Sequence, residues 1–280
     1  MATVLSSTVA AGPQRIASIN LCTDQLLLLL ADRQNIVSVS YFATQPHVSA
    51  LAPLARGIPQ NYGQAEEILT LKPDLVLASV FTTHSTNALL ERLGIPVLEI
   101  SVANGIEEIR RNIRKVAHAV GKPETGTALL KKFDHELAAA SRPISPTAPV
   151  AALYRENNTL YGANTIAGAF TRAAGMENLA DRLGREAFSD LPLEILIERQ
   201  PDFVIEGTGA WHAQRGIRAY RSLHHPALDK LLEKRQLVRV PDRLWACGSP
   251  NVVDAVEILA TAHQKWRTLK KPGTDGGSNP

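Results

Sequence analysis

Short apolar runs alternate with longer amphipathic stretches along most of this chain. The runs are bounded by Gly, Pro or polar residues and lie at 15–20, 36–39, 75–78, 97–100, 150–153, 203–205 and 237–240. Apolar runs of this kind, separated by helical patterns, are typical of parallel strands that helices cover on both faces. The sequence therefore predicts an α/β fold.

Two local features refine the first part of this pattern. Thr23 is expected to cap a helix that runs through Ala31. Residues 41–63 contain three prolines and no clear period, so we expect them to form a long loop.

Residues 105–142 interrupt the alternation. Two helical patterns, 105–120 and 123–140, follow one another with no strand between them. A flexible linker would be rich in Gly and Ser, and this segment is not. We predict a single long interdomain helix, 122–142, that joins an N-terminal lobe (14–121) to a C-terminal lobe (143–267).

The two predicted lobes share a motif. Residues 66–76 (EEILTLKPDLV) and 194–204 (EILIERQPDFV) each place a Glu seven residues before Pro-Asp, at the start of a short helix that leads into a strand. Glu194 follows Glu66 by 128 residues. Repetition at this period indicates two similar lobes rather than a solenoid. Matching on Glu-Ile-Leu would instead place Glu67 opposite Glu194, so both registers stay open.

Composition excludes several classes of protein. Of 280 residues, 45% are apolar and 20% are charged, which is the balance of a globular chain of about two domains. The longest uninterrupted apolar run, 26–31, is far too short to cross a bilayer, so no membrane insertion is expected. The net charge is +3, and only residues 105–142 carry a mild basic excess, which argues against a nucleic-acid partner.

The two ends of the chain stand apart from this pattern. Residues 1–13 are small and uncharged up to an Ala-Ala-Gly sequence, which fits either a signal-peptide remnant or a disordered N-terminus. Residues 268–280 are rich in Gly, Pro and Ser, and we expect a disordered tail there.

The common catalytic and cofactor motifs are missing. The sequence has no G-x-x-x-x-G-K-[ST], G-x-G-x-x-G, G-x-S-x-G or H-E-x-x-H motif, so no cofactor and no metal site is predicted. His224 and His225 are adjacent, and adjacent side chains point in different directions on a helix or strand. A solvated loop is the better interpretation of that pair.

The predicted strand ends are rich in residues that hold ligands. Open α/β sheets bind ligands at the carboxyl ends of their strands. Aromatic residues gather in the loops that follow these ends, at Tyr41, Phe42, Tyr62, Phe81, Tyr154, Tyr161, Trp211 and Trp245. Such faces, with a few Arg and amide groups, suit a large and partly apolar ligand, although we expect about half of them to close the core instead.

Several segments resemble class III periplasmic substrate-binding proteins, the cobalamin and ferric-siderophore binding family that serves ABC importers. They are 15–26 (RIASINLCTDQL), 66–79 (EEILTLKPDLVLAS), 93–97 (LGIPV), 193–196 (LEIL), 200–205 (QPDFVI) and 245–250 (WACGSP). The resemblance runs from about residue 15 to 266. It implies two Rossmann-like lobes with a cleft between them, a periplasmic location, a monomer, and a cargo that is a metal chelate or corrinoid (ferric siderophore, cobalamin or heme).

The resemblance also assigns residues. In this family an exposed Glu on each lobe docks into the two copies of the permease, and Glu66 and Glu194 stand at those positions. A Glu at a helix N-terminus can alternatively do no more than complement the helix dipole. The residues expected to contact cargo are Cys22, Tyr41, Tyr62, Phe81, His84, Arg155, Tyr161, Trp211, Arg243, Trp245 and Cys247.

The two cysteines, Cys22 and Cys247, leave alternatives open. They fit a disulfide, a soft-metal site, or two packed thiols. A thiolate near a helix N-terminus has a lowered pKa, so an α/β enzyme with a cysteine nucleophile is one rival to the binding protein. A metallochaperone that holds metal through both thiols is another.

Overall fold

A computed structural model describes residues 12–80, 82, 84–155, 158–208, 226–233 and 236–270, without the side chains of residues 84, 227 and 229. The chain divides into two compact units. The described residues of the first lie within Met1–Ala103 and Glu107–Lys132, and those of the second within Asn104–Ile106 and Phe133–Pro280. Among the described residues, no helix combines the length and apolar character needed to span a membrane.

The first unit is built on a parallel sheet. Its strand order is β3-β2-β1-β4-β5, and every neighbouring pair is parallel, which confirms the predicted sheet type. The strands are β1 (Ile16–Ser18), β2 (Ile36–Ser40), β3 (Gln60–Asn61), β4 (Leu75–Ser79) and β5 (Val97–Ile100).

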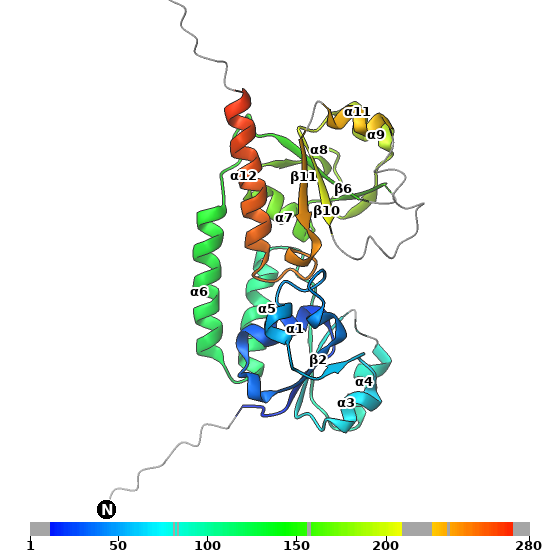
Figure 1. Cartoon of the computed structure of the whole chain (residues 1–280), viewed down its shortest axis with the longest axis vertical. Helices are drawn as coiled ribbons and strands as arrows, with labels where there is room; N and C mark the ends of the chain where they lie inside the picture. The colour runs from blue at the N-terminus through cyan, green and yellow to red at the C-terminus, as the bar shows by residue number, and fades with distance from the viewer. Residues whose placement is uncertain are drawn as a thin grey trace, which may run out of the picture. The chain divides into compact units, whose positions relative to one another are not determined.

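Helices cover this sheet because β1 and β4 are buried at every position and therefore need cover on both faces. Ala17 of β1 and Val76 and Ala78 of β4 form one buried cluster with residues of α3 and α4, and Figure 1 shows both helices beside the sheet. The helical elements of this unit are α1 (Leu21–Leu30), η1 (Arg33–Asn35), η2 (Tyr41–Thr44), α2 (Ala52–Ala55), α3 (Ala65–Thr70), α4 (His84–Arg92) and, apart from its first residue, α5 (Ile106–Ala119).

Two sequence predictions need correction here. The cap of α1 is Asn20, whose side chain accepts the Cys22 N–H at 2.9 Å. Thr23 lies inside the helix, where its hydroxyl bonds to the Ser18 hydroxyl at 2.8 Å. The expected long loop over 41–63 contains η2, α2 and β3, which are short elements without a readable hydrophobic period.

The second unit has a mixed sheet. Its order is β11-β10-β6-β7-β9, with β8 paired to β6 off this path. β10 is parallel to β6 and β11, as predicted, whereas β7 is antiparallel to both β6 and β9. Asn158 precedes β7 with a φ of 59°, in the left-handed region that suits a tight reversal of the chain. The strands are β6 (Val150–Arg155), β7 (Thr159–Tyr161), β8 (Glu177–Asn178), β9 (Phe188–Asp190), β10 (Phe203–Thr208) and β11 (Gln236–Pro241).

Helices flank this sheet as well, and Figure 1 shows α12 alongside α7 and α9 beside α11. Val150, Ala152 and Tyr154 alternate along β6 and pack with residues of α8, α9 and α11 in one buried cluster. The helices are α6 (Pro123–Ala140), whose first ten residues belong to the first unit, α7 (Ile166–Ala173), α8 (Leu179–Arg182), α9 (Leu193–Arg199), α11 (Pro226–Leu232), the short η4 (Asp242–Leu244) and α12 (Val252–Lys270).

The last helix is longer than predicted. α12 continues to Lys270, so residues 268–270 of the expected tail are helical. The Lys270 ammonium lies 3.2 Å from an Asp202 carboxylate oxygen and 4.2 Å from the centre of the Trp266 ring. The contact with Asp202 ties the final turn to the rest of the unit, whereas the contact with Trp266 lies within α12.

The Pro-Asp motif has the same structure in both units. Lys72 and Gln200, which precede the prolines, have φ values of 45° and 46°. Asp74 accepts the N–H groups of Gln14 and Arg15, just before β1, at 2.7 and 3.0 Å. Asp202 accepts the N–H of Val150, the first residue of β6, at 3.0 Å. In each unit the aspartate therefore ties the end of a short helix–turn segment to the start of the first strand.

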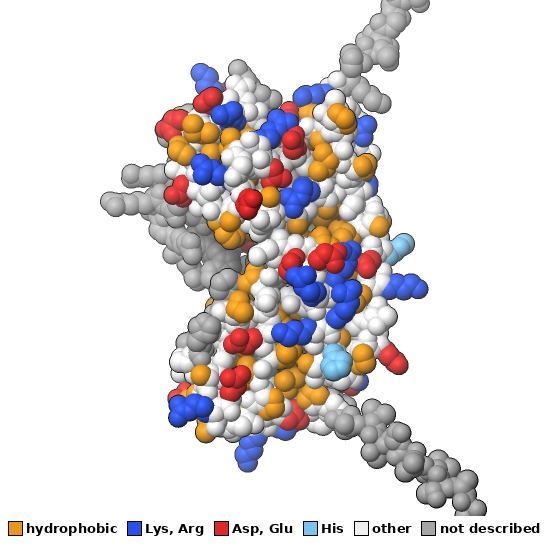
Figure 2. All heavy atoms as spheres, turned by 180° about the vertical axis from the view of Figure 1, so that it is seen from behind, with side chains coloured by type: hydrophobic (Ala, Val, Ile, Leu, Met, Phe, Trp, Pro, Cys, Tyr) orange, Lys and Arg blue, Asp and Glu red, His pale blue; other side chains and the backbone are white. Residues whose placement is uncertain are grey.

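Positive and negative side chains are interspersed on the face shown in Figure 2. On α5, the most basic helix, Arg110 pairs with Glu107, and Arg111 pairs with Glu108 at 2.6 Å. Because these arginines have carboxylate partners on the same helix, the basic excess of residues 105–142 does not form a continuous positive patch on α5.

Candidate ligand-binding site

Three aromatic side chains gather at the carboxyl ends of β2 and β3 in the first unit. The Tyr41 and Tyr62 rings are stacked, with centroids 5.3 Å apart and planes 20° apart, and the Phe42 ring meets Tyr41 edge-on at 5.9 Å. All three are exposed, Tyr62 by 68%. We call Tyr41, Phe42 and Tyr62 the first aromatic cluster. A stacked pair left open to solvent is a ready surface for another flat apolar group.

A buried polar network lies next to this cluster. Asp24 on α1 is fully buried, and its carboxylate accepts the Ser40 N–H at 3.0 Å and the Ser40 hydroxyl at a shorter distance. Burial raises the pKa of Asp24 to about 7, although the hydrogen bonds from Ser18 and Ser40 oppose the shift. The network thus contains a carboxyl group that changes charge near neutral pH.

A second aromatic series runs through the other unit, from its surface into its core. Phe188 on β9 is 61% exposed and meets the Tyr161 ring edge-on at 4.7 Å. Tyr161 meets Trp245 at 5.6 Å, and Trp245 meets the fully buried Phe170 at 5.8 Å. We call Phe188, Tyr161, Trp245 and Phe170 the second aromatic cluster.

An ion pair supports the inner part of the second aromatic cluster. Arg155 makes two bonds to Asp242, at 2.7 and 3.3 Å, and both side chains are buried. The Arg155 guanidinium lies 5.5 Å from the Trp245 ring centre and 6.0 Å from that of Tyr161, within the range of a cation–π contact. A Cβ atom at Gly207 would stand 2.3 Å from Asp242 Oδ1 and 2.6 Å from Arg155 Nη1, so only glycine leaves room for this pair.

The structure sorts the predicted cargo residues by depth. Tyr41, Tyr62 and Arg243 are exposed, and Tyr161 is half-buried. Trp245 is 4% exposed, and Arg155 and Cys247 are also buried. Phe81, Trp211 and the side chain of His84 lie outside the described residues.

Both cysteines are disulfide-bonded, and neither is a free thiol. This decides between the alternatives that the sequence left open for Cys22 and Cys247. A cysteine nucleophile or a thiolate metal site would need a free sulfur, which neither residue offers in this state. Within the described ranges, no group of three or more His, Cys, Asp or Glu side chains is placed to hold a metal ion.

Sequence reasoning missed Phe188 and the network around Asp24. Phe188 lies on β9, a three-residue strand with no apolar period, so it carried no signal of its own. Asp24 and Asn61 are polar residues at buried positions beside strand ends. A polar residue inside an otherwise apolar helical pattern was the signal available for Asp24, because buried polar groups need partners.

The repeated glutamates are exposed, and each is the second residue of a short helix, Glu66 on α3 and Glu194 on α9. The 128-residue register also places the fully buried Ile68 opposite the fully buried Leu196. Glu67 is half-buried, and its carboxylate accepts the Tyr62 N–H at 2.7 Å. Burial and bonding therefore favour Glu66, rather than Glu67, as the counterpart of Glu194.

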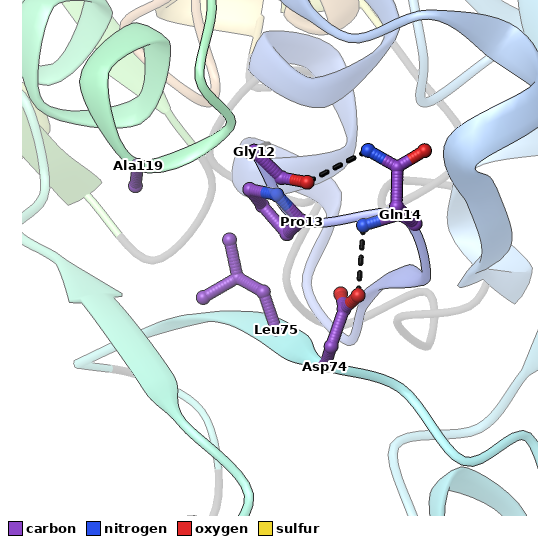
Figure 3. A pocket seen from close by; sticks show the side chains of 6 residues that line it. All are labelled: Gly12, Pro13, Gln14, Asp74, Leu75 and Ala119. Atoms are coloured by element: carbon purple, nitrogen blue, oxygen red, sulfur yellow. Dashed lines mark hydrogen bonds between the residues drawn. The ribbon is translucent and has the colours of Figure 1, made fainter. Parts of the chain in front are cut away.

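A surface cavity of about 470 Å³ lies elsewhere, where the chain enters β1 and β4 (Figure 3). Its one carboxylate, Asp74, already accepts the Gln14 N–H, and the Gln14 side chain donates to the Gly12 carbonyl at 2.7 Å. Because it lies at the amino ends of the strands, this cavity is separate from the first aromatic cluster. The lining residues are Gly12, Pro13, Gln14, Asp74, Leu75 and Ala119.

The family profile described as periplasmic binding protein matches residues 16–220. The match covers most of the chain, and the chain belongs to this family, which is one of substrate-binding proteins rather than enzymes. Two curated relatives, both cobalamin-binding proteins of Halobacterium salinarum strains, are 26% identical over 207 residues, 72% of this chain and 56% of theirs. The chain thus spans about half the length of these relatives.

Solved structures share the fold over nearly the whole chain. The periplasmic heme-binding protein RhuT of Roseiflexus sp. RS-1 matches with a TM-score of 0.68 and 23% identity, covering 91% of this chain and 99% of its own. The heme-binding protein HutB and the vitamin B12 binding protein BtuF, both of Vibrio cholerae, match with TM-scores of 0.70 and 0.61 and identities of 19% and 20%, each covering 92% of this chain and 99% of its own. The predicted two-lobed α/β fold is confirmed.

The Arg155–Asp242 pair leads to a stability prediction. Gly207→Ala forces the two side chains apart, and breaking a buried pair costs about 3–5 kcal/mol because each charge loses its partner. Thermal unfolding should show a large drop in Tm for Gly207→Ala. Gly94→Ala, where a Cβ atom meets nothing within 4 Å, serves as the control and should cost only about 1 kcal/mol for its positive φ. Equal losses from the two variants would contradict this role of Gly207.

The raised pKa of Asp24 predicts a pH dependence of stability. The folded state holds the Asp24 proton up to a pH of about 7, whereas the unfolded chain releases it near 3.8. Between these values the folded state binds more protons, so the free energy of unfolding falls as the pH rises and levels off above 7.

Denaturant titrations from about pH 5 to pH 8 measure this contribution. Asp24→Asn should remove a slope of at most about 1.4 kcal/mol per pH unit, while the exposed Asp254→Asn should keep it. Parallel pH profiles for the wild type and Asp24→Asn would show that Asp24 does not titrate in this range.

Proposed function

We propose that this chain is the substrate-binding component of an ABC importer, which captures a metal chelate or corrinoid and delivers it to a permease in the periplasm. Its family membership supports the binding role. The names of its relatives and structural neighbours, which include cobalamin-binding and heme-binding proteins, support the cargo class.

The observation that carries the cargo proposal is the first aromatic cluster. A protein that only had to stay folded would gain nothing from leaving a stacked Tyr41–Tyr62 pair in water, because exposed aromatic surface gives up the free energy of burial. A large ring system with an apolar face would bury this surface on binding. In the other unit, Phe188 presents a second exposed aromatic surface, and the exposed Arg243, two residues before Trp245, offers a cation for an acidic or carbonyl-rich rim.

We assign different roles to the buried members of the predicted set. Trp245 packs against Phe170 and Tyr161, and the charge of Arg155 is matched by Asp242. Both residues stabilise the surface from within, so a substitution at Trp245 would disturb folding and binding together. Tyr62 and Phe188 are the better probes of cargo contact.

The docking proposal rests on the matched positions of Glu66 and Glu194. A permease made of two copies presents two equivalent basic sites, and a partner with an internal repeat can offer one carboxylate to each. Glu194 also acts on its own lobe, because its charge adds to burial in raising the pKa of Tyr154 to about 12.

Cargo binding is tested with cyanocobalamin, hemin and a ferric hydroxamate siderophore, by fluorescence titration of the full chain. We expect one of these probes to bind, and Tyr62→Ala to weaken that binding by about 2 kcal/mol, which is roughly 30-fold. Leu93→Ala removes a similarly exposed apolar side chain from the same lobe and should leave affinity unchanged. Equal effects of Tyr62→Ala and Leu93→Ala would argue against the aromatic surface.

Docking is tested by charge reversal. Glu66→Arg and Glu194→Arg should leave probe affinity unchanged and reduce permease-dependent uptake at least tenfold, because like charges at an interface cost several kcal/mol. Glu91→Arg on α4 and Glu198→Arg on α9 reverse exposed charges on the same two lobes as matched controls. If Glu66→Arg and Glu194→Arg support uptake at the parental rate, the two glutamates do not dock the permease and only complement their helix dipoles.

A further inference from the structure

We propose that Asp24 and Asn61 are positioning residues, which hold the two backbone segments carrying Tyr41 and Tyr62 so that the rings stay stacked for cargo. The inference deepens the proposed function and rests on it for its cargo measurement. Asp24 and Asn61 are themselves buried, at 0% and 1% exposure, so their effect on a ligand would be exerted through the two tyrosines.

Asp24 holds the segment that carries Tyr41. Its carboxylate accepts both the N–H and the hydroxyl of Ser40, the last residue of β2 and the residue directly before Tyr41. A carboxylate that accepts two bonds from one residue fixes both the position and the orientation of that residue. The direction of the backbone between β2 and η2 is therefore fixed, and with it the position of Tyr41, the first residue of η2.

Asn61 does the same for Tyr62 from the other side. Its side-chain N–H₂ group donates to the Ser18 carbonyl at 2.9 Å and to the Ser38 hydroxyl at 2.6 Å, while its carbonyl oxygen accepts the Gly63 N–H at 3.0 Å. The Asn61 side chain thus binds Ser18 of β1, Ser38 of β2 and the backbone of Gly63. Tyr62 lies between Asn61 and Gly63 in the sequence, so the backbone is held on both sides of it. All three of these bonds would be lost on truncation, and two of the lost partners, the Ser18 carbonyl and the Ser38 hydroxyl, belong to buried residues.

The two anchors meet in one network. Ser18 accepts from Asn61 through its carbonyl, and its hydroxyl bonds to Thr23, the neighbour of Asp24 on α1. Fully satisfied buried networks specify one geometry more strongly than apolar packing does. Here the geometry that is specified is the separation of two strand ends, and hence the 5.3 Å stack of the two rings.

Ionisation of Asp24 gives this anchor a pH dependence. The elements packed most extensively against α1 are β1, β2, β4 and η2, and their residues include one titratable side chain, that of Tyr41. No opposite charge among the described groups of these elements holds Asp24 ionised, and burial raises its pKa to about 7. Below that pH the whole fold gains stability because the buried charge is lost, but the bonds from Ser40 lose their charge-assisted part, so the Tyr41 segment itself is held less firmly.

Hydrogen exchange measured on the full chain without cargo tests the anchoring directly. We expect amide exchange in residues 40–45 to be at least about tenfold faster in Asp24→Asn, and in residues 61–64 to be similarly faster in Asn61→Ala. Asn112→Ala is the matched control, because Asn112 is a buried amide of the same lobe that donates to the Ser101 carbonyl at 2.9 Å, beyond β5 at the far side of the sheet. If Asn61→Ala fails to fold, Ser38→Ala removes a single acceptor of the same amide. Unchanged exchange in the Asp24 and Asn61 variants overturns the proposal.

Probe affinity then links the anchors to cargo. For whichever of cyanocobalamin, hemin or the ferric hydroxamate siderophore the wild type binds, Asn61→Ala should lose roughly tenfold in affinity and Asn112→Ala should lose none. Wild-type affinity should fall as the pH drops through about 7, and Asp24→Asn should lack that change. Equal losses in Asn61→Ala and Asn112→Ala overturn the proposal. Faster exchange in the Asp24 and Asn61 variants, combined with no probe binding by the wild type, would leave the anchoring intact and count against the proposed cargo class.

Discussion

Parallel strands bring all of their carboxyl ends to one edge of a sheet, and both lobes of this protein depend on that constraint. Beyond the last residue of each strand, the backbone N–H and C=O groups are no longer paired with a neighbouring strand. The loops that follow must therefore find other hydrogen-bond partners for these groups. In the first lobe, Ser40 and Asn61 end neighbouring strands and put Tyr41 and Tyr62 side by side. The aromatic surface is therefore a consequence of strand order rather than of proximity in sequence.

The two lobes support their aromatic side chains by different chemistry. In the first, a single buried carboxylate accepts bonds from a serine, with no cation beside it among the groups that shift its pKa. In the second, Arg155 and Asp242 neutralise each other below Trp245. Burying these polar groups costs free energy of desolvation in both lobes. In both lobes the resulting hydrogen bonds fix the positions of the aromatic side chains above them. A binding protein needs such preorganisation because ordering a loose surface on contact with the ligand reduces affinity.

The internal repeat connects fold to function. The left-handed residue before each Pro-Asp, the aspartate that holds the first strand, and the buried Ile68 or Leu196 recur in both lobes. These features keep α3 and α9 in equivalent places, so their exposed glutamates are equivalent too. The repeat thereby offers an exposed glutamate at the same position of each lobe, which is the basis of the docking proposal.

The sequence by itself determined the α/β class, the positions of seven strands and the existence of two similar lobes, because these follow from hydrophobic period and from local Pro-Asp chemistry. Only the tertiary structure decided which residues of the predicted site are exposed. Trp245 and Tyr62 both follow strand ends in the sequence, yet one is 4% and the other 68% exposed. It also placed Phe188 beside Tyr161, and it buried Asp24 against Ser40. Burial and pairing between distant segments depend on which strands lie next to each other, and no local pattern encodes that order.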